Sequence, residues 1–178
     1  TRFPLGISSA DDIDAIGAES RIPCIAARMW PDPWKRIVVI SGSRRDPVAL
    51  ADLQLTSEVA ERIAAATDAP TVVLAPTPAD ADPFHALTDA TDATVDDYRP
   101  RSGDALTKLA PGDLLIAPAH VVAEAGLLAR VRLQGALMNV SVVLVGGPGR
   151  LRVSLHGARP PLMGAVGQKG NVLARAGF

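Results

Sequence analysis

The amino-acid sequence predicts an α/β fold: a doubly wound parallel sheet of about five strands, covered by helices on both faces. Five apolar, strand-like runs recur along the chain. Turn signals follow each of them, and most then lead into a helical stretch. Strands that alternate with helices pair in parallel, and such sheets bind ligands outside the carboxyl ends of their strands. The fold class therefore also indicates where a binding site is expected.

The first part of the chain, residues 1–34, predicts a helix–strand extension. Ser8 or Ser9 can cap a helix whose first turn is rich in aspartate, which suits the positive end of the helix dipole. Pro23–Met29 has the composition of a short strand. The segment Trp30–Trp34 (WPDPW) predicts a rigid turn, because proline fixes φ and keeps the preceding residue out of a helix. Its two tryptophans either pack on the sheet edge or form a partner surface.

The central part, residues 35–150, predicts the α/β domain itself. Its strands are expected at Arg36–Ile40, Thr71–Ala75, Ala93–Tyr98 (an edge strand), Asp113–Ala117 and Val140–Val145. Its helices are expected at Val48–Thr67, Phe84–Ala90, Asp104–Ala110 and Val121–Leu137, and a loop at Pro76–Pro83. Residues 151–178 form a third part. They are rich in glycine and proline, and we expect one more strand at Leu151–Leu155 followed by an irregular tail.

Composition excludes several classes of function. The formal net charge is −1 and aromatic residues make up 3%, which argues against nucleic-acid binding. Cys24 is the single cysteine, so a disulfide framework and a cysteine-rich zinc site are excluded, and the three histidines lack a metal-binding spacing. No stretch is apolar enough to predict a membrane span in this chain. We expect a cytoplasmic location.

The candidate binding residues lie where strands end. After the first central strand come Ser41, Gly42, Ser43, Arg44 and Arg45, where backbone N–H groups and two guanidinium groups can hold a phosphate. The other candidates follow the fourth and fifth strands, namely Pro118, His120, Gly146 and Gly147. The alternative readings are a solvated arginine loop, a histidine that caps the next helix and a structural glycine turn.

Catalytic motifs are weak. Asp96 and Asp97 are adjacent on an expected strand, so they point to opposite faces and cannot share one substrate. No serine lies in a G-x-S-x-G elbow. The sequence favours a non-catalytic domain, and a small α/β hydrolase or transferase that uses Ser43 or the aspartates is the enzymatic alternative.

The layout from Lys35 to Gly147 resembles the universal stress protein family. The resemblance is carried by the opening strand KRIVVISGS, the fourth strand DLLIAPA and the closing strand NVSVVLVGG. It implies the strand order 3-2-1-4-5 and a homodimer that forms through the last strand. ATP-binding members carry an aspartate after the first strand, where this chain has Ser41–Ser43. They also carry a glycine-rich phosphate loop after the fourth strand, where this chain has Ala117–Val122 without glycine.

The resemblance also implies a role. Divergent copies of this fold occur as cytosolic C-terminal domains of cation:proton antiporters, so we expect a non-catalytic regulatory or sensor domain that controls such a transporter. The transporter domain would lie in the same or another chain. The alternative is a nucleotide sensor that binds ATP or cyclic di-AMP in the crevice between the first and fourth strands.

Overall fold

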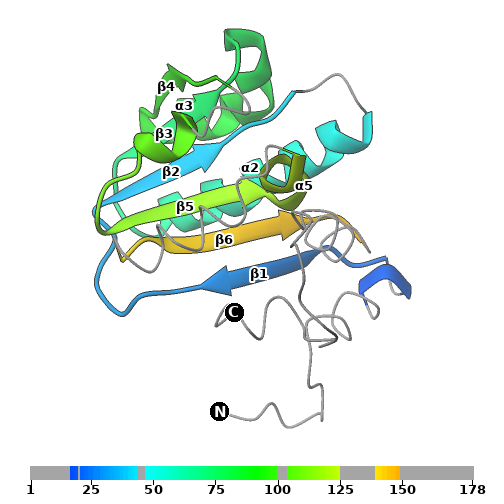
Figure 1. Ribbon diagram of the computed structural model, residues 1–178, viewed down its shortest axis with the longest axis horizontal. Coiled ribbons are helices and arrows are strands. Elements are labelled where there is room, and N and C mark those ends of the chain that lie inside the picture. Colours follow the sequence, from blue (N-terminus) through cyan, green and yellow to red (C-terminus); the bar gives the residue numbers. More distant parts are fainter. Residues whose placement is uncertain (1–16, 20, 44–46, 100–103, 125–138, 149–178) are drawn as a thin grey trace, which may run out of the picture.

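The computed structural model describes residues 17–19, 21–43, 47–99, 104–124 and 139–148 (Figure 1). Their core is one mostly parallel sheet of six strands in the order β1-β6-β5-β2-β3-β4. Five strands run parallel and β1 is antiparallel to its neighbour β6. The strands are β1 (Cys24–Arg28), β2 (Arg36–Ile40), β3 (Thr71–Ala75), β4 (Thr94–Asp97), β5 (Asp113–Pro118) and β6 (Ser141–Gly146).

The strand count and order differ from those expected, because β1 joins the sheet as a sixth strand. Cys24 lies opposite Gly146 and Arg28 lies opposite Val142. All six residues of β6 are buried, and a buried strand needs a hydrogen-bonding neighbour on each side. β5 borders β6 on one side, and β1 borders it on the other. The expected homodimer contact through the last strand is therefore not available, since β6 is bordered on both sides.

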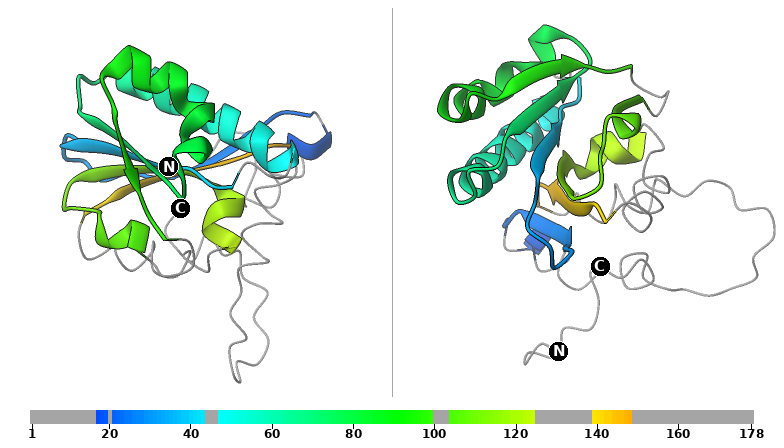
Figure 2. Two further views of the ribbon diagram at one scale, coloured as in Figure 1. Left: turned by 90° about the horizontal axis from the view of Figure 1, so that it is seen from above. Right: turned by 90° about the vertical axis from the view of Figure 1, so that its left-hand side faces the viewer.

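Helices cover both faces of the sheet (Figure 2). One face packs against α2 and α3 with the short 3-10 helix η1, and the opposite face packs against α4 and α5. The first expected helix of the central part is confirmed as α2, which begins one residue earlier and ends two residues earlier than expected. The two short helices are confirmed as α3 and α4, and α4 ends at Thr107 rather than at Ala110. The elements are α2 (Pro47–Ala65), η1 (Pro78–Phe84), α3 (His85–Thr91), α4 (Asp104–Thr107) and α5 (Ala119–Glu124).

The prediction of a loop at Pro76–Pro83 is wrong, because most of this segment forms η1. Thr77 caps this helix: its hydroxyl accepts a hydrogen bond from the backbone N–H of Asp80 at 3.3 Å. Pro78 stands at the first helical position, where its missing N–H has no cost. Three predicted segments lie outside the described residues: most of the N-terminal helix, the remainder of the helix expected to reach Leu137, and the strand at Leu151–Leu155.

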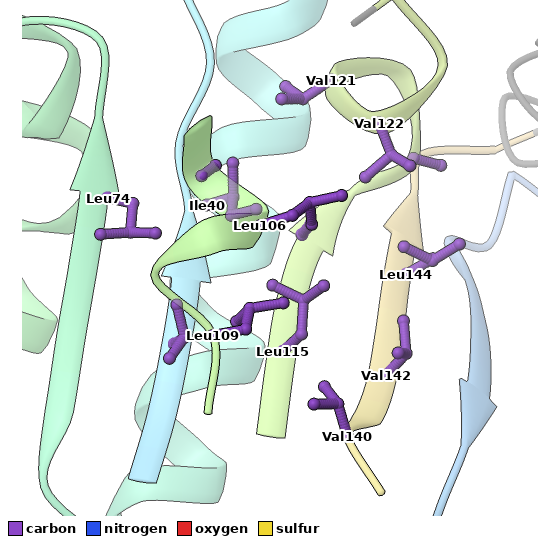
Figure 3. Packing of buried hydrophobic residues seen from close by; sticks show 14 of the residues in the cluster. Ile40, Leu74, Leu106, Leu109, Leu115, Val121, Val122, Val140, Val142 and Leu144 are labelled. Carbon is purple, nitrogen blue, oxygen red and sulfur yellow. The ribbon is translucent and has the colours of Figure 1, made fainter. Parts of the chain in front are cut away.

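The face of the sheet next to α4 and α5 shows why the strands are continuous apolar runs. Ile40, Leu115 and Leu144 project from three neighbouring strands toward Leu106 and Val122 of the two helices, and all five are buried (Figure 3). Alternate residues of the same strands pack against α2 and α3 on the other face. A half-exposed strand alternates between apolar and polar residues, whereas a parallel strand that is covered on both faces is apolar at nearly every position.

An ion pair fixes the amino ends of β2 and β5. Arg36 and Asp113 lie opposite each other in register. The guanidinium group donates two hydrogen bonds to the carboxylate, from Nη2 to Oδ2 at 2.6 Å and from Nε to Oδ1 at 3.2 Å. Asp113 is buried, and its hydrogen bonds raise the pKa of Arg36. This pair keeps a buried charge neutralised far from the expected site.

None of the helices in the described ranges combines the length and apolar character that crossing a bilayer requires.

Candidate functional site

The predicted site residues gather at the carboxyl ends of β2, β5 and β6. Ser41 and Gly42 follow β2 directly, Pro118 ends β5, and Gly146 ends β6. Parallel strands bring these ends to one edge of the sheet, as the sequence pattern indicated. Ser43 is exposed there, and Arg44 and Arg45 lie outside the described residues.

Ser41 is turned away from the crevice and satisfied by protein partners. Its hydroxyl donates to the carbonyl of Asp80 at 2.5 Å, and its N–H donates to the carbonyl of Leu74 at 2.8 Å. Its own carbonyl accepts from the hydroxyl of Tyr98 at 2.7 Å. Ser41 is fully buried. These bonds tie the loop after β2 to η1 and to the end of β4, and a serine held in this way is not placed to act as a nucleophile.

Tyr98 is the second part of this network. It is buried, and burial raises its pKa to about 12, with the negative charge of Asp80 as the smaller cause. The phenol therefore stays protonated and remains a hydrogen-bond donor to Ser41 across the ordinary pH range. Asp80 in turn accepts from the hydroxyl of Thr77 at 2.7 Å. The result is a chain of polar groups that closes the β3–β4 side of the crevice.

Gly42 closes the crevice between β2 and β5. A β-carbon built on Gly42 would lie 2.3 Å from Cγ2 of Val121, a distance that real side chains do not adopt. The loop after β2 therefore lies directly against α5, and both residues are buried. The space between the loop after β2 and α5 is therefore filled by the Val121 side chain.

The third part of the site is a buried acid beside a histidine. Asp52 of α2 is 2% exposed, and its Oδ1 accepts from the backbone N–H of Gly147 at 2.9 Å. Its Oδ2 lies 3.3 Å from Nδ1 of His120, close to this ring nitrogen but without a hydrogen bond to it. Asp52 thus joins α2 to α5 and to the turn after β6. His120 contacts protein rather than open space.

Gly146, the remaining candidate glycine, has a structural role in the sheet. Gly146 is the last residue of β6 and lies opposite Cys24 of β1. It is buried, as is Pro118 at the end of β5. Both residues lie at the predicted edge, but each is part of the strand ladder rather than of a loop. Within the described ranges, no group of three or more histidine, cysteine, aspartate or glutamate side chains is placed to hold a metal ion.

A cavity of about 410 Å³ lies at the opposite end of the sheet. It is lined by the WPDPW segment and by Thr67, which lies just beyond the end of α2. Trp34 also packs against the core below α2, and Arg28 lies 5.1 Å from the ring centre of Trp30. Both tryptophans are partly buried, so they combine packing with a surface-facing edge.

Sequence reasoning missed Asp52 and Tyr98, whose hydrogen bonds to Gly147 and Ser41 join distant segments at this edge of the sheet. A signal existed for Asp52, because it stands next to Leu53 on the apolar side of an amphipathic helix. Tyr98 gave no comparable signal. Comparison with protein-family models, with curated proteins and with solved structures finds no match to this chain.

Proposed function

We propose that this chain is a non-catalytic regulatory domain with a universal stress protein-like arrangement, in which the family's nucleotide crevice is replaced by packed protein. The observation that carries the proposal is the contact between Gly42 and Val121. A ligand phosphate needs free backbone N–H groups and space beside them. Here the space is taken by Val121, and the N–H of Gly147 is bonded to Asp52.

The order of the parallel strands supports the part of this proposal that concerns the universal stress protein-like arrangement. Read from one side, they follow β4, β3, β2, β5 and β6, which is the arrangement 3-2-1-4-5 once β1 is set apart. The same arrangement occurs in other doubly wound folds, so it supports a fold and not an activity. The regulatory role is thus an inference from the filled crevice together with this layout.

The experiment is a titration of the full chain with Mg²⁺-ATP and with cyclic di-AMP, followed by calorimetry and by the shift in melting temperature. We expect no heat of binding and no shift at millimolar ligand, because a specific ligand stabilises the folded state in proportion to its occupancy. Saturable binding of either nucleotide below millimolar concentration would contradict the proposal. In that case Arg44→Ala and Arg45→Ala test whether the loop after β2 holds the ligand.

We propose further that the regulated protein is a cation:proton antiporter, in the same or another chain. This rests on the resemblance of the layout. The coding sequence on the 5′ side of the Thr1 codon, with the genes next to it, provides the test. A transporter-like series of hydrophobic spans there supports the proposal, and the lack of any such series in that region counts against it.

A further inference from the structure

The two edges of the sheet are protected to different degrees. At one edge, all four residues of β4 are exposed and two of them are Asp96 and Asp97. Lys108 forms an ion pair with Asp96 at 2.7 Å, so the edge is covered by charge. At the other edge, β1 is uncharged from Cys24 to Ala27. Charged side chains are the usual protection against strand pairing between molecules, and Arg28 at the end of β1 is the one charged residue of that strand.

The exposed side of β1 is apolar. Ile25 is 52% exposed and Met29, just beyond the strand, is 48% exposed. Cys24 and Ala26 are buried on one face of the sheet, so alternation places Ile25, Ala27 and Met29 on the other. Of the four large apolar residues exposed in the described part of the chain, Ile22, Ile25 and Met29 lie in or beside β1. This strip is the strongest apolar surface feature there.

We propose that β1 pairs antiparallel with β1 of a second copy of this chain, around a two-fold axis that passes beside Ala27. A two-fold axis normal to the sheet pairs residues of the same parity, which allows only a few registers. The register centred on Ala27 places Ile25 opposite the partner subunit's Met29, twice by symmetry. Large apolar residues then meet each other, and the small Ala27 meets its own copy.

Local features limit the contact to one short segment. Pro23 and Pro31 flank the segment from Cys24 to Trp30, and proline interrupts a strand ladder. Arg28, the one charged residue of β1, lies over the ring of Trp30 on the face opposite Ile25, so its charge is directed away from the apolar strip. Such a contact buries less than the roughly 1,200 Å² of a stable interface, so the dimer forms reversibly and at high concentration.

Cross-linking tests the register. The full chain carrying Ala27→Cys is oxidised at high concentration and run on a non-reducing gel. In the proposed register the two Cys side chains lie directly opposite, and we expect a disulfide-linked dimer as the main product. Ile25→Cys is the matched control: its two copies are offset by roughly 13 Å along the strands and should cross-link poorly. Equal yields for both variants, or none for Ala27→Cys, overturn the register.

Mass measurements test the association itself. We expect sedimentation equilibrium of the full chain to give a weight-average mass that rises from monomer toward dimer with concentration. Ile25→Lys should keep the monomer mass throughout, because it places a charge in the strip. Val95→Lys, a substitution at a residue of similar exposure (50%) on β4, should behave like the wild type. A wild-type monomer at every concentration, or the same loss with Val95→Lys, overturns the proposal. Circular dichroism checks that both variants are folded.

Discussion

Gly42 and Val121 are in direct contact across the carboxyl ends of β2 and β5, with only 2.3 Å between Val121 Cγ2 and the place of a β-carbon on Gly42. The first residue belongs to the loop after β2 and the second to the first turn of α5. In doubly wound folds this is the position where the strand order reverses and ligands bind. In this chain the position is filled by the contact between Gly42 and Val121, and both residues are buried.

Replacement of Gly42 by alanine should destabilise the fold. The added methyl group overlaps Val121, and overpacking of a buried contact costs about 1–3 kcal/mol in the free energy of unfolding. Urea denaturation of Gly42→Ala against wild type measures the change.

The double variant Gly42→Ala/Val121→Ala provides the control for this contact. Val121→Ala removes the overlapping methyl group, so the cost of Gly42→Ala should be smaller in this background, with a coupling of about 0.5–3 kcal/mol. Additive effects of the two substitutions would show that the residues do not press against each other.

Loss of the Asp52 carboxylate should weaken the junction of α2, α5 and the turn after β6. Asp52→Ala leaves the buried N–H of Gly147 without its acceptor, which we expect to cost about 1–3 kcal/mol in the free energy of unfolding. Asp52→Asn keeps an oxygen acceptor and should cost less. Chemical denaturation of both variants measures the difference.

Glu58→Ala is the matched control for Asp52, since Glu58 is an exposed acid on the same helix. It should change stability by less than about 0.5 kcal/mol. If Asp52→Ala proved as mild as Glu58→Ala, the buried acid would have no structural role at this edge.

Tyr98 should make the fold sensitive to alkali. Its pKa in the folded chain is about 12, whereas an unfolded tyrosine titrates near about 10. A pKa raised by folding means that the contribution of Tyr98 is fully present below pH about 10 and is lost as the pH rises toward about 12. Tyr98 is the only tyrosine in the sequence, so the ultraviolet absorption of the phenolate reports this group alone.

Tyr98→Phe separates this effect from other groups that titrate in alkali. The variant lacks the hydrogen bond to Ser41 and should lose about 1 kcal/mol at neutral pH. Its stability should then fall less steeply than that of the wild type between pH about 10 and about 12. A phenolate titration near the ordinary value in the folded chain would show that Tyr98 is accessible to solvent.

Strand prediction succeeded where burial on both faces dictates the residue types. β2 and β3 have the bounds expected from RIVVI and TVVLA, because a strand between two helical layers must be apolar at nearly every position. The 3-10 helix η1 was missed, because proline and aspartate are as common in loops as in helix starts. Its capping by Thr77 becomes evident only from the hydrogen bond to Asp80.

The sequence by itself determined the α/β class, the parallel strands and the edge where Ser41, Gly42, His120 and Gly147 meet, because hydrophobic periodicity is a local property that each segment carries. The tertiary structure alone decided that β1 joins the sheet next to β6 and that the crevice is closed. Both depend on partners far apart in the chain: Asp52 bonds to a residue 95 positions away, and Tyr98 to one 57 positions away. Such pairings follow from how the layers pack and leave no periodic pattern in the sequence.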